Sequence, residues 1–323
     1  MSRRVAAIES LLAIALLVVL LVPVAAGQTV WPKGPKLPMA KTWLAEKAKL
    51  PPYTPPRTPG GEPDLQGIWD GAGGDNNSYL EDHEYLDDTT PAQESFVSDP
   101  PDGKIPYTPW ALAKRMEILR SLARGWPGET GERLHVSPGS FCLDYMPVFS
   151  FDAHEIVQKP GYVVMLSNEA YRVIPTDGRS AISQNAKFWL GTSRGRWEGN
   201  TLVVEVTSLN GKGWFDSTGQ FYSENTRMIE RWRLADANTM DYEVTVEDPT
   251  IYTRPWKMNF PRRRAGTGRG PRGVTAVSDP TAVEDQRYAK EFWETGCYEG
   301  NAHTIEVTRS LGFKWFSGVT PPK

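Results

Sequence analysis

Two ionisable residues, Glu230 and Arg172, occur within apolar rows of segments that have the two-residue period of β-strands. Glu230 alternates with apolar residues in RMIERWRLA, and Arg172 does so in EAYRVI. Because successive side chains of a strand point to opposite faces, both residues should point inward with the apolar row. A buried carboxylate is costly unless it is paired or protonated. We therefore expect these two side chains to be partners.

Such a pair has two interpretations. In an enzyme, Glu230 would act as a general acid or base and Arg172 would hold an anionic group, as in a lyase, isomerase or hydrolase. In a structural protein, the pair would only neutralise itself. The same interior should receive Tyr242, from TMDYEVTVED, and Trp232, which shares the row of Glu230. With Trp197 they could line a site for a small apolar, aromatic or sugar-like ligand.

The segment SRGRWEGNTLVVEV, residues 193–206, predicts a β-hairpin. Gly199 and Asn200 tolerate the positive φ angles that tight hairpin turns require. Strand alternation sends Arg196 and Trp197, just before the turn, to opposite faces. We expect Trp197 to be the inward residue of the two.

Short strands with turn signals between them continue from residue 155 to about residue 260. No helical pattern interrupts them, so a mainly β fold is expected, either an antiparallel barrel of the lipocalin or calycin type or a bent sandwich. Two peripheral helices are predicted, over residues 109–124 and about 280–295. In the first, Leu112 should face inward and Arg115 outward. The segment HTIEVTRSL near the C-terminus predicts a last strand.

The N-terminus predicts export. Residues 1–27 combine two arginines, a 16-residue apolar run and small residues at its end, the pattern of a cleaved secretory signal peptide. The apolar run is short for an uncleaved membrane anchor. A Pro-rich arm or linker with one short helix follows over residues 28–63, and a single β-rich domain with a mobile basic loop at about 261–279 covers residues 64–323. The protein should therefore be periplasmic or secreted.

The remaining chemistry is sparse. In an oxidising compartment Cys142 and Cys297 should form a disulfide, although one reactive thiol is the alternative. The run Asp82-His83-Glu84 is better explained as an acidic surface loop than as a metal site, and we expect no metal and no cofactor. The net charge of −3 gives no reason to expect nucleic acid as a partner. The expected partner is a small molecule, with membrane contact only through an uncleaved signal.

Five segments carry a resemblance: RTPGGEPDLQGIWD, EIVQKPGYVVML, YRVIPTDGR, GRWEGNTLVVEV and EDPTIYTRPW. Together they span most of residues 57–256 and resemble a widespread, largely uncharacterised family of secreted bacterial proteins. In that family a His-Pro pair often follows IPTDGR, whereas this chain has Ser180-Ala181. Separately, Gly67-Ile68-Trp69 is similar to the Gly-x-Trp of the first strand in lipocalin-like barrels. The first resemblance implies no activity; the second implies a ligand-holding barrel.

Three functions follow from this pattern. The first is a binding protein with a ligand in an internal cavity. The second is an enzyme that uses Glu230 in the same cavity. The third is a structural envelope protein with a filled barrel. A dry, paired Glu230 favours the third, whereas a Glu230 that is open to a cavity favours the second.

Overall fold

The structure is a computed structural model that describes residues 36–69, 79–85, 92–122, 135–136, 154–167, 170–180, 185–216, 218–265 and 301–322. All of them belong to the unit that spans Pro35–Lys323. The predicted signal peptide, both cysteines, the predicted helix at 280–295 and most of the basic loop lie outside the described residues.

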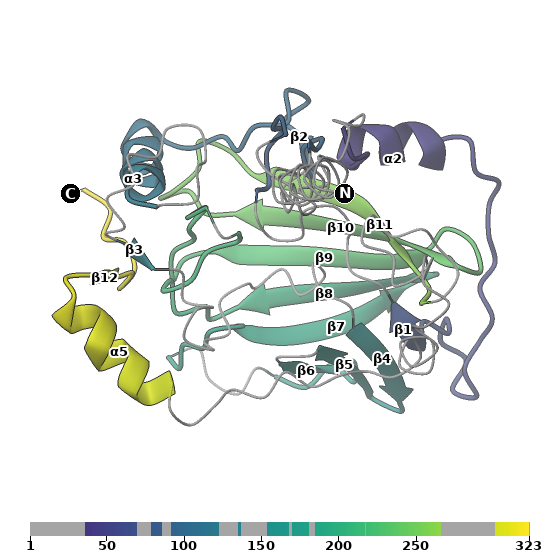
Figure 1. The fold of residues 1–323 in the computed structure, drawn as a ribbon. Helices are drawn as coiled ribbons and strands as arrows, with labels where there is room; N and C mark the ends of the chain where they lie inside the picture. The colour runs from purple at the N-terminus through teal and green to yellow at the C-terminus, as the bar shows by residue number, and fades with distance from the viewer. Residues whose placement is uncertain are drawn as a thin grey trace, which may run out of the picture. The chain divides into compact units, whose positions relative to one another are not determined.

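The larger sheet is antiparallel and has six strands in the order β2-β11-β10-β9-β8-β7 (Figure 1). The strands are β2 (Val97–Asp99), β7 (Thr192–Glu198), β8 (Thr201–Thr207), β9 (Arg227–Leu234), β10 (Thr239–Glu247) and β11 (Trp256–Arg263). The predicted hairpin is β7–β8, in which Glu198 pairs with Thr201 across the turn. Strands β7 to β11 follow one another in the chain and in the sheet: short turns join β7 to β8 and β9 to β10, and longer loops over residues 208–226 and 248–255 make the other two connections.

The smaller sheet is also antiparallel, with four strands in the order β1-β4-β5-β6. Its strands are β1 (Gly67–Trp69), β4 (His154–Lys159), β5 (Tyr162–Ser167) and β6 (Tyr171–Pro175). A separate parallel pair joins β3 (His135–Val136) to β12 (Lys314–Trp315).

The two sheets form a bent sandwich, and they do not close into a barrel. Among the described residues no ladder joins β6 to β7. On the other side, the isolated bridge between the sheets joins Trp69 of β1 to Arg264, just after β11. Side chains fill the β6–β7 gap instead: the guanidinium of Arg172 donates to Ser193 Oγ. The mainly β prediction is confirmed in its sandwich form, and the barrel alternative is wrong.

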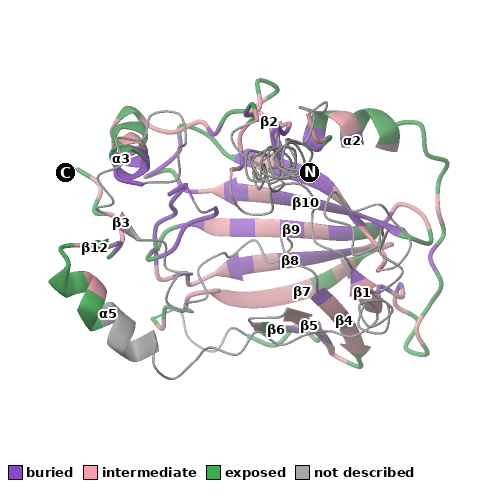
Figure 2. Ribbon diagram, viewed as in Figure 1, coloured by how far each residue is buried: buried purple, intermediate pink, exposed green. Residues whose placement is uncertain are grey.

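Alternation of buried and partly exposed residues is regular along β9 (Figure 2). The inner row of β9 meets those of β8, β10 and β11 in the core, where four tryptophans are fully buried: Trp69, Trp214, Trp232 and Trp256. The outer face carries shared ion pairs, such as Glu205 with Arg194 and Arg227, and Glu198 with Arg196 and Arg231. The sequence period therefore separates a filled core from a charged outer surface.

Helix α3 (Pro109–Arg120) lies where a peripheral helix was predicted, but its buried face differs. Leu112 is exposed and Arg115 is buried, so the predicted orientation is wrong. Arg115 points inward because its guanidinium donates to Thr218 Oγ1 at 2.8 Å. The apolar part of this face is formed by Ala111, Ile118 and Leu119.

Helix α5 (Asn301–Ser310) occupies the segment that was predicted as the last strand. The strand prediction is wrong, because local hydrogen bonding favours the helix. Gly312 has a φ of +86°, its N–H donates to Arg309 O, and the N–H of Phe313 donates to Thr308 O. These bonds are a Schellman motif, in which a glycine ends a helix.

The arm that precedes β1 packs on the larger sheet. It contains helix α2 (Ala40–Lys47), which is close to the short helix expected in this segment. Trp43 Nε1 donates to Asp241 Oδ1 at 2.8 Å, and Lys47 Nζ donates to Asn259 Oδ1 at 2.8 Å. The arm then continues to β1, with Arg57 Nη2 donating to Asn200 in the β7–β8 turn. The Pro-rich segment is thus held by β10, β11 and the hairpin turn.

Candidate functional site

Glu230 lies at the centre of β9, between Val204 of β8 and Val244 of β10. It belongs to the inner row, as alternation predicts, and none of its side-chain surface is exposed. Water therefore does not solvate this carboxylate, so its charge depends on neighbouring protein groups.

Arg172 supplies the opposite charge from the inner row of β6. Its Nη1 donates to Glu230 Oε1 at 3.0 Å and its Nη2 to Oε2 at 2.8 Å, while only 3% of its side chain is exposed. This is the bidentate geometry in which a guanidinium binds both oxygens of a carboxylate. Ser193 Oγ of β7 accepts from Arg172 Nε at 3.2 Å and Nη2 at 2.8 Å. The pair therefore joins the two sheets across their gap.

Tyr242 completes the surroundings of the carboxylate. Its hydroxyl donates to Glu230 Oε1 at 3.0 Å, and its ring lies 4.3 Å from that of Trp232, between centroids. Burial, followed by the negative charge of Glu230, raises the pKa of Tyr242 well above its ordinary value near 10. The hydroxyl therefore stays protonated and acts as a donor. Among the described residues, Glu230 accepts three hydrogen bonds, two from Arg172 and one from Tyr242.

Trp197 and Arg196 separate as alternation predicts. Trp197 is partly buried and packs against the core, whereas Arg196 is exposed and pairs with Glu198. Four of the five predicted residues are thus brought together around one buried carboxylate: Arg172, Glu230, Trp232 and Tyr242. Trp197 lies in the same layer but makes no polar contact with this group among the described residues.

A second buried polar group was missed from the sequence. Arg262 is fully buried near the C-terminal end of β11. Its Nη2 donates to His154 Nδ1 at 2.9 Å and to Trp69 O at 3.3 Å. The His154 ring meets Trp232 edge-on at 5.4 Å. Arg262 follows the inner row Trp256, Met258 and Phe260, so the period of two was the signal. It was overlooked because PRRR was assigned to a loop.

A third buried group surrounds Asp216, in the loop between β8 and β9. Its carboxylate accepts backbone N–H groups of Leu80 at 3.1 Å, Thr218 at 2.9 Å and Gln220 at 3.2 Å. Burial raises the pKa of Asp216 to about 6, although the charge of Arg115 opposes this rise. These contacts join two loops that are distant in sequence. No short sequence pattern indicated them, because they depend on tertiary packing.

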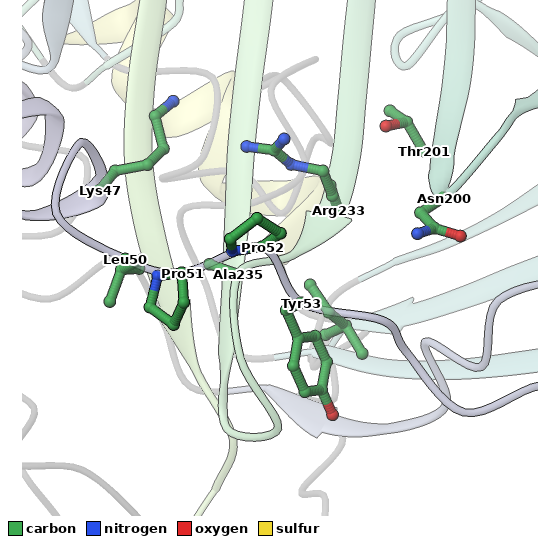
Figure 3. A pocket seen from close by; sticks show the side chains of 10 residues that line it. Lys47, Leu50, Pro51, Pro52, Tyr53, Asn200, Thr201, Arg233 and Ala235 are labelled. Atoms are coloured by element: carbon green, nitrogen blue, oxygen red, sulfur yellow. The ribbon is translucent and has the colours of Figure 1, made fainter.

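A pocket of about 460 Å³ opens on the surface between the arm and the ends of β8 and β9. Figure 3 shows Lys47 at the left, Arg233 in the middle, and Asn200 and Thr201 at the right, with Leu50, Pro51 and Pro52 below Lys47 and Arg233. The lining comprises Lys47, Leu50, Pro51, Pro52, Tyr53, Asn200, Thr201, Arg233, Leu234 and Ala235. None of the five predicted site residues belongs to it.

Metal-binding groups are absent from the described part of the chain: no three His, Cys, Asp or Glu side chains there converge for an ion. In the acidic run, Asp82 and Glu84 pair with Lys36, and the backbone of His83 pairs with that of Gln93. The proposed bridge between Cys142 and Cys297 lies outside the described residues.

Comparison with known proteins gives no further guide to the site. No family model, no curated protein and no solved structure matches the chain. None of the described helices combines the length and apolar character needed to span a bilayer. Any functional conclusion therefore depends on the geometry of the side chains themselves.

Proposed function

We propose that this protein is an exported, non-catalytic scaffold of the cell envelope, whose interior is filled and whose interactions occur at its surface. The observation that carries the proposal is the Glu230 carboxylate, which is fully buried and accepts hydrogen bonds from Nη1 and Nη2 of Arg172 and from the Tyr242 hydroxyl. Of the three candidate functions, the filled envelope protein fits this arrangement best.

The enzyme alternative fits less well. A general acid or base must come within hydrogen-bond reach of the proton that it transfers. Glu230 has no exposed side-chain surface, and Arg172 donates a hydrogen bond to each of its two carboxylate oxygens. A substrate could reach it only by displacing the strands or side chains around it.

The internal-ligand alternative meets the same obstacle. Trp232 and Tyr242 are fully buried and their rings pack on each other. Arg172 is almost fully buried. These residues contact protein where a ligand was expected. The support for export is separate, and consists of the predicted signal peptide in residues 1–27 and the resemblance to secreted bacterial proteins.

The test is native mass spectrometry of the protein recovered from the cells that make it. We expect a mature chain without residues 1–27 in the periplasmic or secreted fraction. A full-length chain in the cytoplasm would overturn the export part of the proposal. The double variant Arg172→Met with Glu230→Leu provides the control: a small molecule that the wild type retains and this folded variant loses would overturn the filled-scaffold part.

A further inference from the structure

The surface pocket beside helix α2 is a built site that no part of the proposed scaffold role uses. We propose that it binds a small amphipathic carboxylate, with Arg233 holding the carboxylate and the segment Leu50 to Tyr53 covering the apolar body. A pocket of about 460 Å³ falls within the size range of small-molecule sites.

The cationic end of the pocket has an excess positive charge. Lys47 and Arg233 both pair with Asp241, at 3.1 Å and 3.0 Å, so two cations share one carboxylate. Asp241 is also bound by Trp43 Nε1 and by Asn259 Nδ2, at 2.8 Å and 2.9 Å. The acid is thus fully engaged within the protein, and one positive charge is left for a ligand.

Arg233 is the residue positioned to make the contact. Its side chain is 47% exposed, compared with 22% for Lys47 and 8% for Asp241. Among the described residues its only hydrogen bond is the one from Nη2 to Asp241, so Nε and Nη1 are available. Lys47 Nζ already donates to both oxygens of Asp241 and to Asn259 Oδ1. Lys47 therefore contributes charge, whereas Arg233 contributes hydrogen bonds.

The walls suit an apolar body of limited length. Leu50, Pro51, Pro52 and Tyr53 form one wall, and two consecutive prolines hold it in an extended conformation before any ligand binds. Leu234 and Ala235 contribute apolar surface from the strand end. At the far end, the amide oxygen of Asn200 accepts a hydrogen bond from Arg57 Nη2 at 2.6 Å. The side-chain oxygen is therefore already used within the protein, and the amide N–H groups are not used in this bond.

These features together select the ligand class. Arg233 is the only arginine among the lining residues, and its exposed guanidinium fork matches one planar carboxylate. The excess charge that Lys47 and Arg233 leave after pairing with Asp241 matches a monoanion better than a dianion. The apolar walls disfavour a fully polar acid, and the small volume disfavours a polymer. An aryl or short alkyl carboxylate satisfies all four conditions. This inference does not depend on the scaffold role, because neither Glu230 nor Arg172 lines the pocket.

The experiment is isothermal titration of the full mature chain with phenylacetate, 2-phenylethanol and phenyl phosphate. We expect phenylacetate to bind with a Kd of about 1 mM or tighter, and 2-phenylethanol to bind at least about tenfold more weakly because it lacks the charge. Equal affinities for these two probes, or no saturable binding of phenylacetate, would overturn the proposal. Tighter binding of phenyl phosphate would overturn the assignment to a carboxylate.

Matched variants locate the site. Arg233→Gln should weaken phenylacetate about tenfold, and Tyr53→Ala should do so by removing apolar wall without changing charge. Arg231→Gln is the control, because Arg231 lies on the same strand and outer face but pairs with Glu198, outside the pocket. Its affinity should stay within about twofold of the wild type. Unchanged binding in both Arg233→Gln and Tyr53→Ala would overturn the assignment. A ligand lost in Arg233→Gln but kept in the Arg172–Glu230 double variant supports this pocket without affecting the scaffold proposal.

Discussion

Replacing Glu230 with glutamine should be severely destabilising, because it leaves a buried guanidinium without its counter-charge. The pair is 3% and 0% exposed, and it is held by two hydrogen bonds of 3.0 Å and 2.8 Å. Removing one partner of such a pair costs about 3–5 kcal/mol of unfolding free energy. The loss reflects the charge left behind more than the net value of the pair.

Removing both charges should have a much smaller effect. In Arg172→Met combined with Glu230→Leu, apolar side chains of similar length replace both ions, and such replacements are often neutral or stabilising. The double variant should therefore be more stable than Glu230→Gln alone, and lie within about 2 kcal/mol of the wild type. Tyr242 then loses its acceptor, which limits the recovery.

Urea unfolding monitored by tryptophan fluorescence gives the measurement, since the chain has 12 tryptophans and several lie in the core. Arg231→Gln serves as the exposed control, with an expected loss below about 1 kcal/mol. The melting temperature of Glu230→Gln should fall by roughly 10 °C, given about 2–4 °C for each kcal/mol in domains of this size class. A loss below about 1 kcal/mol in Glu230→Gln, or a double variant no more stable than that single variant, would refute the buried pair.

Three further predictions concern pH and packing. Burial raises the pKa of Asp216 from 3.8 to about 6, so its stabilising contribution is complete below the ordinary pKa and is lost as pH rises through about 6, by roughly 3 kcal/mol at most. The unfolding free energy of the wild type minus that of Asp216→Asn should fall over this window, and a constant difference would contradict the prediction. Burial also raises the pKa values of Tyr242 and Tyr252 well above 10, so the free energy of unfolding should fall above that pH as these tyrosines ionise in the unfolded chain. The phenolate absorbance of the native protein should therefore be the same in the wild type and in Tyr242→Phe. If the variant showed one titrating tyrosine fewer than the native wild type, burial of Tyr242 would be contradicted. A side chain at Gly195 would meet β6 side-chain atoms at 2.9 Å, so Gly195→Val should cost about 1–3 kcal/mol in thermal unfolding, whereas Gly199→Asn, in a turn with nothing within 4 Å, should change little; equal effects would exclude close β6–β7 packing.

Sequence reasoning predicted what depends on local periodicity. The strand rows placed Glu230, Arg172 and Tyr242 inward and even indicated the partner of the buried carboxylate. A period of two determines which face a side chain occupies, and a buried charge requires an opposite charge nearby. Those two constraints were sufficient for the inner cluster.

The features that failed depend on contacts between distant segments. Arg115 was predicted to face outward, yet it is buried and donates to Thr218, in the loop that carries Asp216. The surface pocket could not be predicted, since its lining comes from the arm, the β7–β8 turn and the end of β9. For α5 a local signal was available in Gly312, which ends the helix, and the strand prediction did not use it.

The packing of the arm has a consequence for the order in which the protein is completed. Trp43 and its acceptor Asp241 are 198 residues apart, and Lys47 and Asn259 are 212 residues apart. The chain is synthesised from its N-terminus, so the arm emerges first. Its residues 37–42 can bond residues 92–95 early, but Trp43 and Lys47 lack their acceptors until β10 and β11 have formed. Its closure should therefore be among the last folding events, after the sheet is assembled. In a truncated chain that lacks β11, the arm would be exposed to proteases. Resistance of the arm to proteolysis would therefore indicate that β11 has been synthesised.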